Sequence, residues 1–205
     1  MNEKVDEILF DKTSGNAIGV RCGSKAAIGR RIIAEPAYVP RRFLSSSGRV
    51  VRSVFILDHE IKGTDSASCQ IIIPQQQVAL AGLTPRKHDI FINSLSYIHR
   101  VAPTRRWVAI VSTICDGTSK NPYEELSLGV NMLGKTLGRF DLPINEMFVP
   151  KGDDSTTLFI SRALDATSNF ESVAEDVMSL WKRITGHDLD MSISAKDILE
   201  EEEED

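Results

Sequence analysis

Short apolar runs separated by turn-forming residues fill the first third of the chain, and this pattern predicts β-strands. Residues 5–10 and 17–22 are two such runs, and the polar stretch 12–16 between them contains a Gly-Asn pair. Two strands flanking a short polar turn predict a β-hairpin. A further run at residues 31–34 predicts a third strand that ends before Pro36.

The middle of the chain continues this pattern after residues 37–48, which contain Pro40, two arginines and three serines and predict a connector. The predicted strands are residues 50–57, 69–73, 88–97 and 107–114, followed later by 144–149 and 157–162. No helical pattern separates the first four runs. This favours antiparallel pairing, because parallel strands need long crossover connections.

Residues 69–73 are the most distinctive of these strands. They contain three consecutive isoleucines, which are β-branched and stiff at χ1 and therefore favour a strand. With apolar groups on both faces, the strand is predicted to lie in the interior, buried on both sides. Pro74 lacks a backbone N–H, so the strand should end there, and Gln75 to Gln77 should return the chain to solvent.

Two helices are predicted in the last third. The first begins at Asn121, a capping residue followed by Pro122 at the first helical position. Its apolar stripe, at spacings of three and four, is Leu126, Val130, Leu133, Leu137 and Phe140. The second begins with a capping box at residues 168–171 and ends at Gly186. Its predicted buried face is Phe170, Val173, Ala174, Val177, Trp181 and Ile184.

The composition is that of an ordinary globular protein, with 205 residues of which 41% are hydrophobic and 26% charged. The net charge of −5 comes from residues 200–205, since without these six acidic residues 24 basic residues face 23 acidic ones. We therefore predict a folded body over residues 1–190 and an acidic, disordered tail over 191–205. The basic residues are scattered without an aromatic platform, so nucleic acid is not a predicted partner.

The cysteine pattern indicates a reducing compartment. Cys22, Cys69 and Cys115 are widely spaced and form no CxxC motif, so we interpret them as structural rather than catalytic or metal-binding. The N-terminus has no apolar signal-peptide region, and no apolar run approaches the roughly 20 residues that span a bilayer. The sequence thus predicts a cytoplasmic protein.

No catalytic, cofactor-binding or metal-binding motif is recognisable. The four histidines are scattered along the chain: His59, His88, His99 and His187. They show no HExxH spacing, and phosphate-binding glycine loops are also lacking. His59 has acidic neighbours that could raise its pKa, although a solvated loop is the favoured interpretation.

Asp165 and Thr167 lie between a predicted strand and a predicted helix start. Many α/β proteins bind a phosphate or ribose at that position. The alternative, which we favour, is that the two side chains satisfy exposed backbone amides. No residue is therefore assigned to a catalytic, cofactor or metal site.

Four stretches of the chain resemble the Rab GDP-dissociation inhibitor family. They are 68–75 (SCQIIIPQ), 96–102 (SYIHRVA), 108–113 (VAIVST) and 165–171, in which DAT is followed by FE. Their order and spacing also agree with the family from residue 4 to about residue 190. The related Rab escort proteins share the fold but match these stretches less well, especially around Asp165.

The resemblance implies a regulatory binding protein and not an enzyme. Such proteins bind prenylated Rab GTPases in the GDP state, slow nucleotide release and extract the lipidated GTPase from membranes. They bind no flavin and catalyse no reaction, so we expect no cofactor and no small-molecule substrate, and membrane association only through the Rab. The implied fold is α/β (α+β), part of a flavoprotein-like domain I with a mixed, largely antiparallel sheet and a closing helix at 170–186.

The resemblance covers only the C-terminal half of such a protein, so we expect a fragment. No Rab-binding residue can be assigned to a numbered position. Unpaired sheet edges and uncovered apolar faces should make the chain alone prone to aggregation. Two alternatives stay open: a member of the Rab escort branch, and a fragment of a flavin-dependent oxidoreductase of the same fold.

Overall fold

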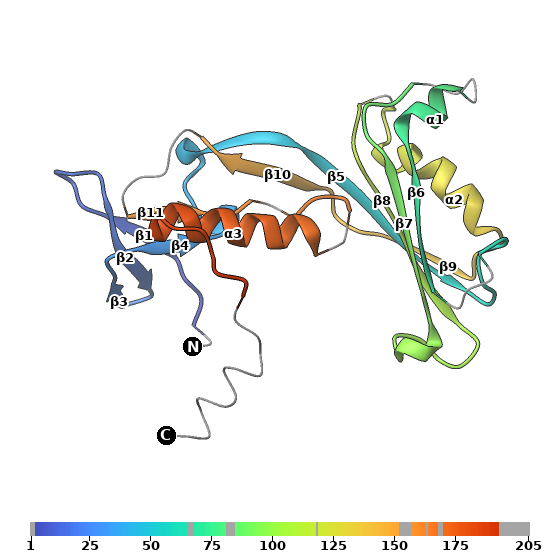
Figure 1. Ribbon diagram of the computed structural model, residues 1–205, viewed down its shortest axis with the longest axis horizontal. Helices are drawn as coiled ribbons and strands as arrows, with labels where there is room; N and C mark the ends of the chain where they lie inside the picture. Colours follow the sequence, from blue (N-terminus) through green and yellow to red (C-terminus); the bar gives the residue numbers. More distant parts are fainter. Residues whose placement is uncertain are drawn as a thin grey trace. The chain divides into compact units, whose positions relative to one another are not determined.

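The computed structural model describes residues 3–64, 68–80, 85–117, 119–151, 157–162, 164–167 and 170–192. The chain folds into two compact units. Unit 1 is assembled from Met1–Leu44, Pro150–Arg162 and Phe170–Asp205, and unit 2 from Ser45–Val149 and Ala163–Asn169. Each unit has its own sheet or sheets and its own helices (Figure 1).

A six-stranded sheet dominates unit 2. Its strands are β5 (Leu44–Leu57), β6 (Cys69–Ile73), β7 (Ile90–Ser96), β8 (Trp107–Ile114), β9 (Gly138–Asp141) and β10 (Asn145–Pro150). The order is β10-β5-β8-β7-β6, and β9 also pairs with β5. The pairs β5–β8, β8–β7, β7–β6 and β5–β9 are all antiparallel, as the short connections predicted.

One face of this sheet carries the main core. Alternate residues of each strand point to the same side, and there they meet a 3₁₀ turn, η4 (Pro122–Leu126), and the helix α2 (Ser127–Leu133) (Figure 1). The core comprises Val51, Phe55, Leu57, Ile61, Ile90, Ile92, Ala109, Val111, Leu126 and Leu133. Gly129 allows α2 this close approach, since a Cβ there would lie 2.7 Å from Val111 Cγ1 and 3.0 Å from Ile90 Cγ2.

The β6 strand has the predicted bounds but not the predicted environment. It pairs with β7, and among the described residues no strand pairs with its other side. Ile72 is 50% exposed, so the prediction of an interior strand buried on both faces is wrong. Gln76 and Gln77 are exposed, as the predicted return to solvent requires, and Gln75 to Gln77 form the start of a short helix, α1 (Gln75–Leu80).

The first predicted helix is also shorter than the stripe indicated. Asn121 caps η4 as predicted, with its Oδ1 accepting from the Tyr123 N–H at 3.2 Å. The helix α2 then ends at Gly134, whose φ of +73° is in the left-handed region. Phe140 belongs to β9, where it pairs with Val54 of β5. Strand pairing across the sheet therefore overrides the helical periodicity beyond Leu133.

Unit 1 holds two small sheets and one helix. The strands β1 (Glu7–Phe10), β2 (Ala17–Cys22) and β3 (Lys25–Ile28) form an antiparallel sheet, and β4 (Ile32–Ala34) pairs in parallel with β11 (Leu158–Ile160). The hairpin of β1 and β2 is as predicted, but β3 was not foreseen. Two 3₁₀ turns, η1 (Pro36–Tyr38) and η2 (Arg41–Phe43), and the start of β5 occupy the predicted connector.

The helix of unit 1, α3 (Glu171–Thr185), ends at Gly186 as predicted, and the left-handed φ of +80° there explains the glycine. The predicted buried face is wrong. Phe170 is 89% exposed, Val177 53% and Trp181 44%, while the residues buried on α3 are Asp176 and Leu180. The buried stripe is thus offset from the predicted one by one residue, or about 100° of rotation.

Two polar contacts account for the orientation of α3. Asp176 Oδ2 accepts from the backbone N–H of Arg162 at 2.9 Å. Arg183 donates to the carbonyl of Ile160 at 3.1 Å, beside the end of β11. The helix lies beside β11 (Figure 1), and both contacts reach the end of that strand or the residue two positions beyond it. Satisfying these backbone groups therefore turns the apolar stripe outward.

The mixed, largely antiparallel α/β architecture and the C-terminal helix confirm the predicted fold class. The N-cap of α3 is Phe170, with no side-chain capping hydrogen bond, so the predicted start of the helix at a capping box over 168–171 is wrong. Residues 168 and 169, and the predicted acidic tail from residue 193 onward, lie outside the described residues. None of the helices in the described ranges has the length and apolar character needed to cross a bilayer.

Candidate functional site

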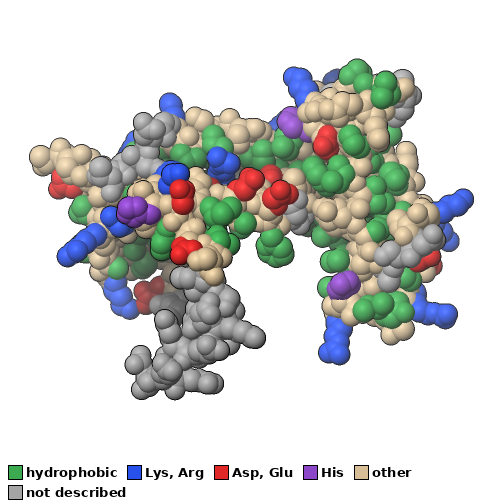
Figure 2. Space-filling model, in the orientation of Figure 1, with side chains coloured by type: hydrophobic (Ala, Val, Ile, Leu, Met, Phe, Trp, Pro, Cys, Tyr) green, Lys and Arg blue, Asp and Glu red, His purple; other side chains and the backbone are tan. Residues whose placement is uncertain are grey.

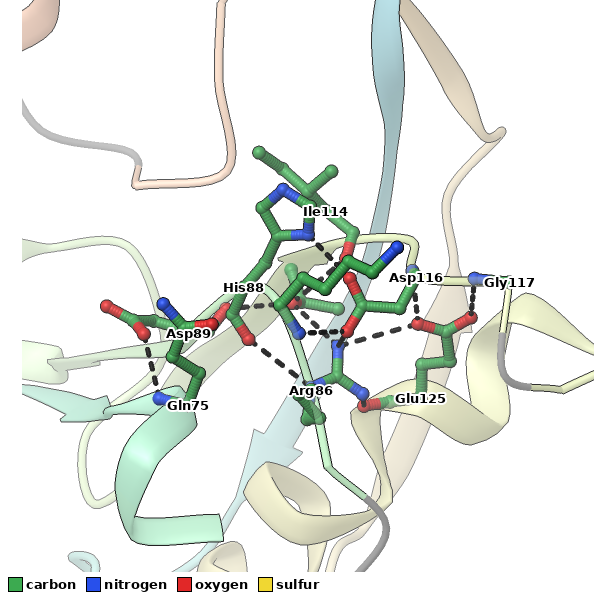
Figure 3. A network of polar contacts seen from close by, with 10 residues as sticks. Gln75, Arg86, His88, Asp89, Ile114, Asp116, Gly117 and Glu125 are labelled. Atoms are coloured by element: carbon green, nitrogen blue, oxygen red, sulfur yellow. Dashed lines mark hydrogen bonds and ion pairs between the residues drawn. The ribbon is translucent and has the colours of Figure 1, made fainter. Parts of the chain in front are cut away.

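A buried network of charged side chains lies in unit 2, where the chain enters β7 and leaves β8 (Figure 3). Arg86 precedes β7, Asp116 follows β8, and Glu125 is in η4. These side chains are 7%, 2% and 1% exposed, respectively. No sequence pattern indicates this network, because Arg86 and Glu125 are 39 residues apart.

Glu125 is the principal acceptor of the network. Its carboxylate accepts from the backbone N–H of Asp116 at 2.8 Å and of Gly117 at 3.0 Å, and Arg86 Nη2 lies 3.4 Å away. Arg86 also donates to the Glu125 carbonyl at 3.1 Å and to Thr113 Oγ1 at 3.0 Å. Both charged groups thus exchange their hydration for several protein hydrogen bonds, as buried charges require.

Asp116 forms the second half of the network. Its carboxylate accepts from the Lys87 N–H at 2.8 Å, lies 2.5 Å from His88 Nδ1, and lies 3.9 Å from Arg86 Nη2. Burial by itself would raise the pKa of Asp116. The hydrogen bonds from Lys87 and His88 and the charge of Arg86 outweigh that effect, so the pKa is lowered and the carboxylate form is favoured.

The network continues into α1 and β7. The Asp89 carboxylate accepts from the Gln75 N–H at 2.9 Å, and the Asp89 carbonyl accepts from Thr113 Oγ1 at 2.8 Å (Figure 3). Strand ends, η4 and α1 are therefore held together by one connected set of hydrogen bonds. This arrangement fixes the position of chain segments and does not present an activated nucleophile to solvent.

The Asp165 segment, the ligand-site candidate from the sequence, lies against the sheet of unit 2. Asp165 Oδ1 accepts from the Thr167 N–H at 2.9 Å and from Thr167 Oγ1 at 2.6 Å. The backbone carbonyl of Asp165 accepts from Arg52 Nη2 at 3.0 Å, and that of Ala166 accepts from Ser112 Oγ at 2.6 Å. Asp165 matches the favoured alternative, because its carboxylate accepts from a backbone N–H, whereas the Thr167 hydroxyl donates to that carboxylate and not to a backbone group.

The four histidines do not come together. His88 joins the network, whereas His99 and His187 are exposed. His59 lies between two carbonyl oxygens, with Nδ1 2.8 Å from the oxygen of Glu60 and Nε2 3.0 Å from that of Lys135. The two carbonyls raise the pKa of His59, because only the protonated ring can donate to both. Asp58, the acidic neighbour noted in the sequence, contributes less than the carbonyls.

The cysteines and acidic residues show no metal or redox site in the described part of the chain. Cys22, Cys69 and Cys115 are free thiols. Burial raises the pKa of Cys69 and of Cys115, which disfavours the reactive thiolate. Among the described residues, no three His, Cys, Asp or Glu side chains are grouped so that they could hold a metal ion. The fold and its polar network define an α/β scaffold held together by buried charges.

Comparison with known proteins places this scaffold in a family. The family model for the GDP dissociation inhibitor matches residues 1–196. A probable secretory pathway GDP dissociation inhibitor of Schizosaccharomyces pombe is 41% identical over 191 residues, which cover 92% of this chain and 41% of that protein. Rab GDP dissociation inhibitor beta of Rattus norvegicus is 38% identical over 193 residues, which cover 93% of this chain and 40% of that protein.

A solved structure agrees with these matches. The crystal structure of Rab GDI from Plasmodium falciparum has a TM-score of 0.82 and 29% sequence identity, covering 93% of this chain and 42% of that one. The chain belongs to the GDP dissociation inhibitor family. It spans about two fifths of the length of the curated relatives it matches.

Proposed function

We propose that the intact gene product is a Rab GDP-dissociation inhibitor, which binds prenylated Rab GTPases in the GDP state. It would inhibit GDP release and return the GTPases from membranes to the cytoplasm during vesicle traffic. The present chain would be the C-terminal part of its domain I. The protein would act by binding alone, with no cofactor, no small-molecule substrate and no catalysed reaction.

The observation that carries this proposal is the family match over residues 1–196, which leaves little of the chain unassigned. The similarity is also three-dimensional, since the TM-score of 0.82 to a Rab GDI extends over 93% of the chain. The polar chemistry supports the same proposal. The charged network has its donors and acceptors paired within the protein, which suits a rigid binding scaffold better than a catalytic centre.

GDP release from a prenylated Rab tests the proposal directly. The Rab is loaded with a fluorescent GDP analogue, and release is followed with and without the intact gene product. We expect release to slow in its presence, and we expect the complex to elute as a single species on size-exclusion chromatography. Matched controls are the same Rab without its lipid and the same Rab loaded with a GTP analogue, both of which should bind far more weakly.

Unchanged GDP release at saturating protein, with no complex formed, would contradict the proposal. A complex that forms only when a prenyltransferase is added would instead favour the escort branch. Yellow colour and flavin absorbance of the purified protein would favour the oxidoreductase alternative.

A further inference from the structure

The loop that joins β7 to β8 exposes two apolar side chains at its surface. It comprises residues 97–106 and includes the 3₁₀ turn η3 (Tyr97–His99). Ile98 is 64% exposed and Val101 49% exposed. Neither residue contributes to the core of unit 2, so both are available to an external partner.

The same loop carries a local positive charge. Arg100, Arg105 and Arg106 lie within it, and residues 97–107 contain no Asp or Glu. In the space-filling view, basic side chains flank a hydrophobic patch at the end of unit 2 that carries this loop (lower right in Figure 2). Residues 1–199 contain 24 basic and 23 acidic residues and are nearly neutral, so this local excess of positive charge is not a property of the bulk composition.

The backbone of the loop is folded into two defined turns. The Arg100 N–H donates to the Tyr97 carbonyl at 2.9 Å, and the Arg106 N–H donates to the Pro103 carbonyl at 3.0 Å. Arg100 and Arg105 have φ values of 58° and 60°, and they are the only residues other than glycine with positive φ in the described ranges. Arginine is uncommon in this left-handed region, where Asn is several-fold enriched.

An aromatic pair lies at the base of the loop. Tyr97 and Trp107 pack edge to face, with ring centroids 5.9 Å apart. The loop thus combines exposed apolar side chains, arginines beside them and an aromatic pair at its base. Proteins carry the same three kinds of group where they contact a membrane–water interface. Arginine can also extend its guanidinium toward headgroup phosphates while its aliphatic stem stays among apolar groups.

We propose that the β7–β8 loop docks on an anionic membrane surface, with Ile98 and Val101 entering the headgroup region and Arg100, Arg105 and Arg106 contacting lipid phosphates. An acidic protein surface is the alternative occupant for apolar residues beside arginines, and it would give no binding to protein-free anionic vesicles. This contact is made by the chain itself and needs no bound GTPase. It is therefore distinct from membrane association through a Rab.

Flotation of the 205-residue chain with vesicles tests the docking. Vesicles of phosphatidylcholine alone are compared with vesicles that also contain phosphatidylserine, and flotation is chosen because aggregated protein sinks while bound protein rises. We expect binding to the anionic vesicles that weakens as salt is raised. Absence of binding to the anionic vesicles, or equal binding to both kinds, would overturn the proposal.

Two loop variants separate charge from apolar contact. The variant R100N/R105N removes two charges while placing a residue suited to positive φ at each position, and should lower the partition coefficient about 30-fold. The variant I98S/V101S should lower it by at least about tenfold. The charge control is K62Q/K120Q and the apolar control is L80S; all three residues are exposed in unit 2 and should leave binding unchanged.

Tryptophan fluorescence gives a second readout. The chain contains two tryptophans, so the variant W181F leaves Trp107 at the base of the loop as the single reporter. We expect its emission to shift to the blue with anionic vesicles and to be quenched by brominated lipid. Loop variants that bind as tightly as the parent, or a Trp107 signal that vesicles do not change, would place any lipid contact elsewhere and overturn the proposal. Bare vesicles contain no GTPase, so this result is independent of the Rab experiment.

Discussion

Unit 2 covers one face of its sheet with elements that follow closely in the chain, whereas unit 1 leaves much of its helix uncovered. In unit 2, η4 and α2 follow β8 within a short stretch and bury ten core residues to 2% exposure or less. Unit 1 draws on three separate stretches of the chain. Its helix α3 buries Leu180 but leaves Phe170, Val177 and Trp181 exposed.

The difference shows that a good apolar stripe does not guarantee burial. The stripe on α3 is as regular as that on α2, but the nearest partner of α3 is the three-residue strand β11. A strand of that length buries one narrow side of a helix, and polar contacts from Asp176 and Arg183 decide which side it is. The predictions that follow test whether the two units differ in stability as they differ in burial.

The largest contrast is expected between two phenylalanines. Phe55 on β5 is 1% exposed and Phe170 before α3 is 89% exposed. Phe55→Ala should lower the free energy of unfolding by about 3–5 kcal/mol through lost burial and the cavity left behind. Phe170→Ala should change it by no more than about 0.5 kcal/mol. Urea unfolding of both variants measures the difference, and equal losses would show that Phe170 is buried in solution.

The next largest loss of stability is expected from a substitution in the charged network. Glu125→Gln keeps the side-chain shape but removes the charge that accepts from Asp116, Gly117 and Arg86, and should cost about 1.5–3 kcal/mol. The neighbouring Glu124 is exposed, so Glu124→Gln is a matched control with an expected change within about 0.5 kcal/mol. A Glu125→Gln loss no greater than that of its control would show that the network does not stabilise the fold.

A smaller, pH-dependent effect is expected at His59. Because two carbonyls raise its pKa in the folded state, its stabilising contribution is complete below the ordinary histidine value of 6.5 and is lost as pH rises through the folded pKa. His59→Gln should therefore cost up to about 1 kcal/mol near pH 6 and less above pH 8. Thermal unfolding across this range measures it, with the exposed His99→Gln as control; a pH-independent difference would contradict the assignment.

The smallest effect on stability is expected for substitutions on the exposed apolar side of α3, which should instead change the self-association of the chain. The variant F170S/V177S should leave the free energy of unfolding within about 0.5 kcal/mol but should reduce self-association measured by light scattering. Leu80→Ser, at a similarly exposed position on α1 in unit 2, is the control and should change association little. A parent chain that is already a monomer with a cooperative thermal transition would contradict the expectation of aggregation.

Local sequence signals located most elements because they depend on neighbouring residues. The bounds of β6 and β8, the break at Pro74 and the end of α3 at Gly186 were all predicted from such signals. The strand β3 was missed because Lys25–Ile28 has a short, weakly apolar pattern and is exposed throughout. The length of α2 was wrong because β9 pairs with β5, a partner more than 80 residues earlier in the chain.

The charged network could not be predicted for the same reason. Its members are ordinary polar residues in separate segments, and only the fold places Arg86 beside Glu125 and His88 beside Asp116. The β7–β8 loop is the opposite case. The sequence already contains its three arginines and two apolar residues, but whether they are exposed depends on how the strands end.

The sequence by itself determined the strand-rich order, the antiparallel pairing and the family resemblance, because these depend on residue patterns within a few positions of one another. The tertiary structure decided which strand lies at an edge, which side of α3 is buried and which charges meet in the interior. Those features depend on contacts between residues tens of positions apart, where hydrogen-bond satisfaction and close packing select among faces that the sequence pattern leaves equivalent.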